Sequence, residues 1–164
     1  MAQPLTRLKR WLMSRDRQYE TVVGQVESLV SDAPSFVAAL ASVAALLNDT
    51  FEHYFWVGFY LAHEDGSLTV GPYQGPLACV RIERGKGVCG TAAERMEPLL
   101  VADVDAFAGH IACDSRSRSE LVVPIVRDGR LRAVLDVDSD ALDAFDETDR
   151  DGLVKIASLL AAVD

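Results

Sequence analysis

The sequence lacks any apolar run long enough to span a bilayer, and its first residues lack the continuous apolar stretch of a secretion signal. These absences argue against a membrane-spanning helix and favour a cytoplasmic location. Basic residues are outnumbered, with 16 Lys and Arg against 25 Asp and Glu, which gives a net charge of -9. Because such a field repels phosphate backbones, we expect no nucleic acid and no membrane among the partners.

Cysteine is scarce, and the chain has only Cys79, Cys89 and Cys113. An odd number of cysteines without a secretion signal argues against a framework of structural disulfides. Free cysteines in a reducing compartment are usually small buried apolar side chains. A chemical role for any of the three must therefore be argued from its surroundings.

The 164 residues contain no repeat, linker or low-complexity stretch that would divide them, so they suit a single domain with a substantial core. Apolar residues recur at helical spacing over 17–30 and 36–47, with a break at Pro34. We expect an N-terminal arm over residues 1–16 and one domain over residues 17–164.

The rest of the chain has the patterns of strands and turns. Asp128-Gly129 lies between two apolar runs, ELVVPIV and LRAVLDV, and this is typical of a tight β-hairpin. A last helix is predicted from Asp146, a good N-cap residue. Hairpins without alternating βα units predict an α+β fold, an antiparallel sheet with helices packed on one side. The other predicted segments are strands at 55–62, 67–73 and 77–82, a short helix within 85–96 and a loop at 106–119.

The local sequence around Cys113 and Cys89 allows a reactive or a structural interpretation, whereas that around Cys79 favours a structural one. Cys113 lies in a polar, small-residue segment, GHIACDSRSRSE, where Arg116 and Arg118 favour a reactive thiolate and Asp114 opposes it. Cys79 alternates with apolar neighbours in LACVRI, as a core strand residue would. Cys89 follows two glycines near a helix start, so either the helix dipole or close packing explains it.

Three carboxylates and two aromatic residues lie at strand positions. Period two places Asp136 and Asp138 on one face of a strand, and Glu120 begins the strand before it. The pair is either a solvent-facing strand end or a cation site for an amine or a metal. Trp56 and Tyr60 also share a face, as core residues or as walls of a small-ligand pocket.

Four segments together resemble the free methionine-(R)-sulfoxide reductases, a family of GAF domains: YFWVGFYL, ACVRIERGKGVCGTAA, GHIACDSRSRSELVVPI and AVLDVDS. The similarity extends from about Tyr19 to the end of the chain and includes the spacing of all three cysteines. It implies a GAF-type fold and thiol-dependent reduction of free L-methionine (R)-sulfoxide through a cysteine sulfenic acid and an intramolecular disulfide.

The resemblance also implies roles for individual residues. Cys113 corresponds to the attacking cysteine and Cys79 to the resolving one, with Cys89 as an alternate. The implied substrate-binding residues are Trp56, Tyr60, Glu120, Asp136 and Asp138. No cofactor and no resident metal are implied. The expected partners are free methionine sulfoxide, a thioredoxin-like reductant and a second copy of the chain in a homodimer.

Two other functions remain open on the sequence. The first is a GAF sensor domain that binds a small ligand without turnover. The second is a metal site made from the cysteines and His110, although the cysteine spacings lack the close CxxC pairs usual in structural zinc sites.

Overall fold

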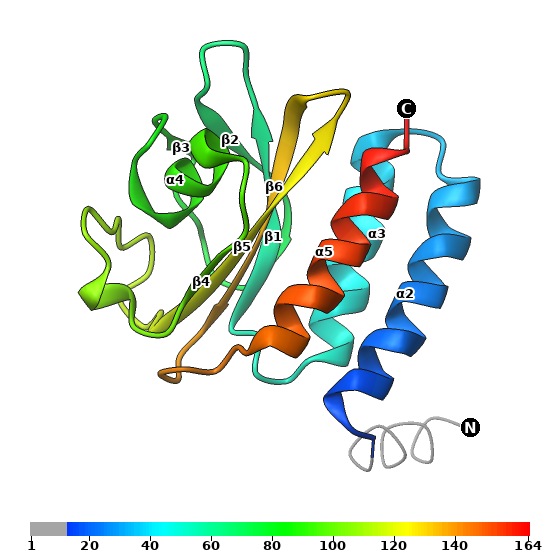
Figure 1. The fold of residues 1–164 in the computed structure, drawn as a ribbon, viewed down its shortest axis with the longest axis horizontal. Coiled ribbons are helices and arrows are strands. Elements are labelled where there is room, and N and C mark those ends of the chain that lie inside the picture. Colours follow the sequence, from blue (N-terminus) through cyan, green and yellow to red (C-terminus); the bar gives the residue numbers. More distant parts are fainter. Residues whose placement is uncertain (1–12) are drawn as a thin grey trace.

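A computed structural model describes residues 13–164, and a six-stranded antiparallel sheet forms its centre (Figure 1). The strands lie in the order β3-β2-β1-β6-β5-β4, and every neighbouring pair is antiparallel. The strands are β1 Trp56–Ala62, β2 Leu68–Gln74, β3 Arg81–Ile82, β4 Leu99–Val101, β5 Ser119–Arg127 and β6 Arg130–Ser139. The helices are α2 Arg15–Asp32, α3 Phe36–Thr50, α4 Gly87–Arg95, α5 Glu147–Ala161 and the 3-10 turn η1 Val104–Ala106.

The sheet has two differently covered faces. Helices α3 and α5 pack on one face of the sheet, and α2 packs against both of them on the side away from the sheet (Figure 1). Leu40, Phe59 and Leu135 belong to the larger apolar core on this face. Helix α4 lies on the opposite face, above a second cluster that includes Trp56 and Tyr60. The predicted α+β class and antiparallel sheet are confirmed, and the second face is the one on which a site can form.

Local sequence signals explain where the helices begin. Ser14 and Ser35 cap α2 and α3 through their side chains, so α3 starts just beyond Pro34. Asp146 caps α5 in a capping box with Asp149, as the sequence predicted. Helix α2 already begins at Arg15, inside the expected N-terminal arm, and residues 1–12 of that arm lie outside the described part of the chain.

The β5–β6 hairpin is confirmed. Asp128 and Gly129 both have positive φ angles, 52° and 74°, as a tight turn between twisted strands requires. One strand prediction was wrong, and one strand was not predicted. The segment 77–82 forms a strand only at Arg81–Ile82, because Leu77 and Val80 find no buried face and remain 84% and 74% exposed. The three-residue edge strand β4 was missed because so short a run carries no periodic signal.

A buried carboxylate ties the helical layer together. Asp149 of α5 accepts hydrogen bonds from Arg15 Nη1 at 2.6 Å and from Tyr19 Oη at 2.9 Å, both donors belonging to α2. It also accepts from the backbone N–H of Asp146 at the start of its own helix. Burial alone would raise the pKa of Asp149, but hydrogen bonds from His53 and Asp146 and the charge of Arg15 outweigh it and lower that pKa. The ionised form of Asp149 therefore joins α2 to α5.

Candidate functional site

Strand register brings the candidate residues into adjacent rows on the face beneath α4. Asp138 of β6 lies between Trp56 of β1 and Glu120 of β5, so three neighbouring strands contribute one residue each. Two residues before Asp138 on β6, Asp136 is paired with Gly58 of β1. Because alternate strand residues share a face, Glu120, Asp136, Asp138 and Trp56 all point to the same side of the sheet.

Aromatic rings form one wall of this region. The Trp56 ring stacks on Tyr60 at a centroid distance of 5.9 Å and on Tyr73 at 5.3 Å, and its Nε1 donates to the carbonyl of Pro76. Gly58 makes this arrangement possible, since a Cβ there would lie 2.6 Å from the Trp56 ring and 2.3 Å from the Cβ of Tyr73. The indole plane is thus fixed by its neighbours on both sides.

The carboxylates are buried together, which overturns the interpretation of a solvent-facing strand end for Asp136. Glu120 is 6% exposed and Asp136 is 5% exposed. Burial, together with the neighbouring carboxylates Asp136 and Asp138, raises the pKa of Glu120 well above its usual range. Burial and Asp138 do the same to the pKa of Asp136. Burial raises the pKa of Asp138 to about 6, although a hydrogen bond from Ser117 opposes the rise.

The cysteines occupy two different environments. Cys79 and Cys113 form a disulfide with a Cα–Cα distance of 5.2 Å, and both come from loops rather than strands. The prediction that Cys79 lies in a strand is therefore wrong. Cys89, in the first turn of α4, is a free thiol and is only 3% exposed. Its burial, followed by the charges of Asp136 and Glu120, raises its pKa well above 9.0, so close packing outweighs any effect of the helix dipole.

Several contacts hold the Cys113 loop against the sheet. Arg116 forms an ion pair with Asp114 at 2.7 Å, and its guanidinium lies 4.7 Å from the centre of the Phe55 ring. The Oγ of Ser117 donates to Asp138, and the backbone N–H of Arg118 donates to the carbonyl of Ser139. The positive charge of Arg116, which the sequence suggested would favour a Cys113 thiolate, is thus already paired with a carboxylate.

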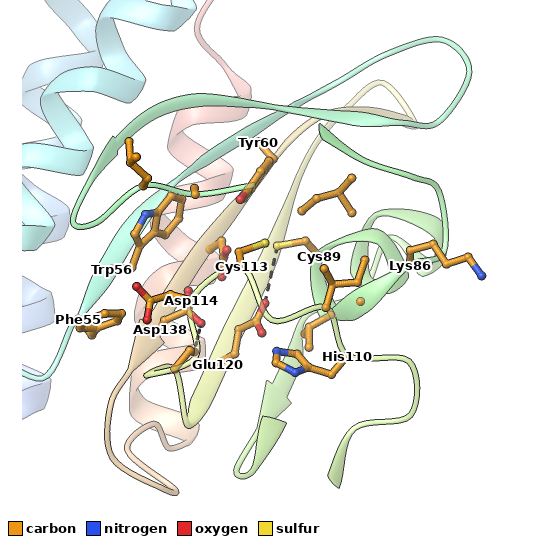
Figure 2. A pocket seen from close by; sticks show the side chains of 18 residues that line it. Phe55, Trp56, Tyr60, Lys86, Cys89, His110, Cys113, Asp114, Glu120 and Asp138 are labelled. Carbon is orange, nitrogen blue, oxygen red and sulfur yellow. Dashed lines mark hydrogen bonds between the residues drawn. The ribbon is translucent and has the colours of Figure 1, made fainter. Parts of the chain in front are cut away.

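These parts enclose one pocket, with the sheet as its floor (Figure 2). All eight candidate site residues lie around it, since Cys113 lines the pocket and Cys79 is bonded to it. The sequence analysis did not single out the further lining residues Phe55, Lys86 and Ser117, although each lies within one of the segments that resemble the family. His110 also lines the pocket. Within residues 13–164, however, the side chains that lie close enough together to share a metal ion are Cys89, Glu120 and Asp136.

The chain resembles known proteins over nearly its whole length. Residues 33–163 match the GAF domain family. The chain is 41% identical to the free methionine-R-sulfoxide reductase of Escherichia coli, with 92% of this chain and 91% of that protein aligned. It is 48% identical to GAF domain-containing protein A of Dictyostelium discoideum, over 90% of this chain and 92% of that one.

Solved structures agree with these sequence relationships. The free methionine-R-sulfoxide reductase from Neisseria meningitidis, solved in complex with its substrate, superposes with a TM-score of 0.88 at 48% identity and covers 91% of this chain and 89% of its own. The reduced form of fRMsr from Staphylococcus aureus gives a TM-score of 0.83 at 45% identity, over 87% and 92% of the two chains. The fold and the site define a GAF domain with a redox-active pocket, and the chain belongs to the free methionine-R-sulfoxide reductase family.

Proposed function

We propose that this enzyme reduces free L-methionine (R)-sulfoxide to L-methionine, with Cys113 as the attacking cysteine and Cys79 as the resolving cysteine. The observation that carries the proposal is the Cys79–Cys113 disulfide beside a pocket that combines an aromatic wall with three carboxylates. A disulfide in this position is the intermediate that would form after the resolving step and persist until a reductant acts on it.

The proposed chemistry proceeds in three balanced steps. The Cys113 thiolate attacks the sulfoxide sulfur and takes over its oxygen, so methionine leaves and a sulfenic acid stays on Cys113. The Cys79 thiol then condenses with that sulfenic acid, which forms the disulfide and releases water. A dithiol reductant, which we propose to be thioredoxin-like, exchanges with the disulfide and returns both cysteines to thiols.

The carboxylates have distinct proposed roles because their surroundings differ. Glu120, whose pKa is raised by burial and by the charges of Asp136 and Asp138, is proposed as the group that protonates the sulfoxide oxygen. Asp138, with a pKa of about 6, is ionised above that pH and is the carboxylate proposed to attract the substrate ammonium group. The bound cation would in turn lower the raised pKa of Asp136 and let it share the contact. Trp56 and Tyr60 are the proposed apolar wall for the methyl and sulfur end.

The deciding experiment supplies purified protein with the two epimers of free methionine sulfoxide and with a thioredoxin system. We expect turnover of the R epimer, and little action on methionine sulfoxide within an oxidised protein, which has no free ammonium group on the residue. Equal rates on the free amino acid and on the oxidised protein would overturn the proposal. Binding of methionine sulfoxide without any methionine formed would instead support the alternative of a GAF sensor domain.

Two further proposals concern the state of the molecule. We propose a cytoplasmic location, since the reaction needs a dithiol reductant, and the described residues contain no helix long and apolar enough to cross a membrane. We also propose a homodimer, as GAF domains often form. The apolar stripes of α2 and α3, which the sequence suggested as its interface, are buried in the core of the single chain and do not supply it. Light scattering at micromolar concentration should give twice the chain mass of 17.8 kDa, and a monomer mass would contradict this.

A further inference from the structure

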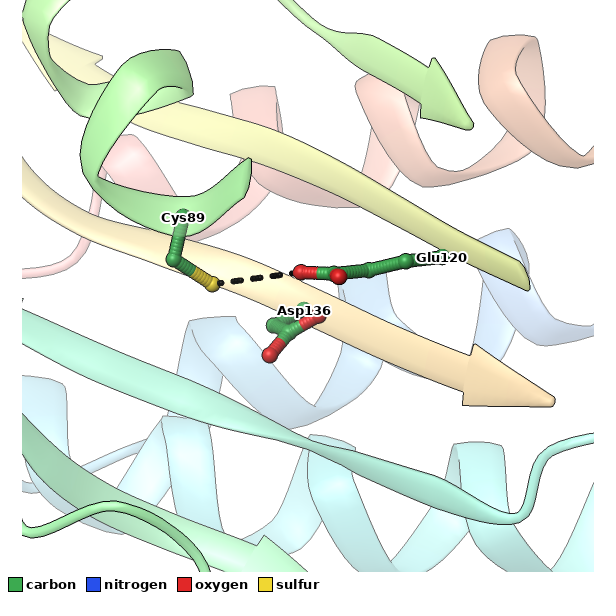
Figure 3. Close-up of side chains that lie close together, drawn as sticks. All are labelled: Cys89, Glu120 and Asp136. Carbon is green, nitrogen blue, oxygen red and sulfur yellow. Dashed lines mark hydrogen bonds between the residues drawn. The ribbon is translucent and has the colours of Figure 1, made fainter. Parts of the chain in front are cut away.

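Three side chains meet below the disulfide, and none of them belongs to it. Cys89 comes from α4, Glu120 from β5 and Asp136 from β6 (Figure 3). One ligand atom of each, a sulfur and two carboxylate oxygens, lies within 4.8 Å of the other two. The redox chemistry proposed above leaves Cys89 without a role, although it lines the same pocket.

The cluster has an unmet need for positive charge. Asp136 is 95% buried, and its Oδ1 has no hydrogen-bond partner. The contact between Cys89 Sγ and Glu120 Oε1, at 3.7 Å, relies on the thiol proton. Buried carboxylates without partners are costly, so a cation that entered here would gain binding energy from groups that nothing else satisfies.

The geometry and the ligand types agree with a soft divalent cation. Zinc bonds of about 2.3 Å to sulfur and about 2.0 Å to oxygen, at a tetrahedral angle, separate the two ligand atoms by about 3.5 Å. Cys89 Sγ and Glu120 Oε1 already lie 3.7 Å apart. A thiolate beside two carboxylates favours zinc or cobalt over magnesium or calcium, which prefer oxygen ligands alone.

We propose that Cys89, Glu120 and Asp136 form a binding site for a thiophilic divalent cation of the Zn²⁺ class, and that this cation competes with the substrate. Three protein ligands leave the fourth tetrahedral position to water, because the cluster faces the pocket. Binding requires the Cys89 thiolate, so one proton leaves to solvent as the metal enters. The metal and the substrate ammonium both use Asp136, so they cannot bind together, and this competition rests on the proposed function.

The disulfide provides a clean test. In the oxidised protein Cys89 is the only remaining thiol of the chain, so a sulfur-to-cobalt charge-transfer band must come from it. Titration of the oxidised protein with Co²⁺ should give this near-ultraviolet band with one metal bound per chain. Zn²⁺ should then bleach the band by displacing Co²⁺. Cys89→Ser should abolish it.

Further variants distinguish a specific metal site from nonspecific binding to surface carboxylates. Glu120→Gln and Asp136→Asn should each weaken Co²⁺ binding at least about tenfold, the loss typical even of residues that only support metal ligands. Asp128→Asn is the matched control, since Asp128 is a 93% exposed carboxylate at the hairpin tip, and it should bind Co²⁺ like the wild type. Absence of the band in the wild type, or its persistence in Cys89→Ser, would overturn the inference.

Displacement by ligands tests competition separately. Free methionine should displace Co²⁺, whereas N-acetylmethionine, which has no ammonium group, should not. A band that depends on Cys89 but resists free methionine would support the metal site and overturn the placement of the substrate ammonium beside it. The metal site would also stand if the protein failed to reduce methionine sulfoxide, so the two proposals fail independently.

Discussion

The Oγ of Ser117 donates a hydrogen bond to Oδ1 of Asp138, so the loop that carries Cys113 is joined directly to the acidic floor of the pocket. This bond opposes the effect of burial on the pKa of Asp138. In Ser117→Ala the pKa of Asp138 should rise above its value of about 6. Because ionised Asp138 is proposed to attract the substrate, the acidic limb of the kcat/KM profile should move to higher pH.

Single-turnover methionine formation, followed from pH 5 to pH 9, measures this shift. Ser115→Ala is the control, since Ser115 lies in the same loop, is exposed and does not line the pocket. A uniform loss of rate in Ser117→Ala, with the limb unmoved, would mean that Ser117 only supports the loop.

The cysteine variants test the order of attack and resolution. Cys113→Ser should abolish methionine formation, because the proposed attacking thiol is removed and the buried Cys89 thiol, whose pKa is raised, is a poor nucleophile. Cys79→Ser should form one methionine per chain and then stall as a sulfenic acid, which dimedone labels and mass spectrometry detects. Cys89→Ser should still form the Cys79–Cys113 disulfide, since Cys89 is outside it. A stalled sulfenic acid in Cys89→Ser would instead identify Cys89 as the resolving cysteine.

Asp138→Asn should lower catalytic efficiency while it raises the stability of the fold. We expect a loss of kcat/KM of at least about tenfold, because a charge-assisted contact to the substrate is removed. Burial raises the pKa of Asp138 from 3.8 to about 6, so wild-type stability falls as pH rises through this interval, where the folded state binds more protons than the unfolded state. Asn at this position carries no such cost, so the variant should be more stable by about 3 kcal/mol at pH 8, since one pKa unit corresponds to about 1.4 kcal/mol.

Urea unfolding at pH 8 and at pH 4 measures this second effect, and the advantage of Asp138→Asn should shrink toward pH 4. Asp140→Asn is a suitable control, because Asp140 is exposed and lies just beyond the pocket. Wild-type kinetics in Asp138→Asn would reject the proposed substrate contact even if the stability change were found.

Asp149→Asn should destabilise the helical layer. Its lowered pKa means that ionised Asp149 stabilises the fold above the pKa of the unfolded state, and that this contribution is lost as pH falls through its folded pKa. Removing its charge leaves Arg15 without its buried partner and should cost about 3 kcal/mol at pH 7. Thermal or urea unfolding measures the loss, with the exposed Asp151→Asn as the control. An equal effect in both variants would contradict the role of the buried network.

The sequence predicted correctly those features that are determined within a single helix, strand or turn. Alternation within β6 placed Asp136 and Asp138 on one face, and Asp128-Gly129 located the hairpin. The contact of Cys89 with Glu120 and that of Ser117 with Asp138 join residues 31 and 21 positions apart, so they depend on strand register and helix packing that no local pattern encodes. Cys79 was misplaced because alternation with apolar neighbours predicts a strand even where no partner strand is available.

The residues proposed for substrate recognition and those proposed for electron transfer lie in parts of the molecule that differ in rigidity. The carboxylates and Trp56 lie on β1, β5 and β6, at positions where each strand has a partner on both sides or, for Trp56, a partner in β6, whereas Cys79 and Cys113 lie on loops. Backbone amides in β1, β5 and β6 should therefore exchange with deuterium only when the whole domain opens, in either redox state. The cysteine loops can open locally at far lower free energy, so each round of oxidation and reduction can proceed while the recognition surface keeps its shape.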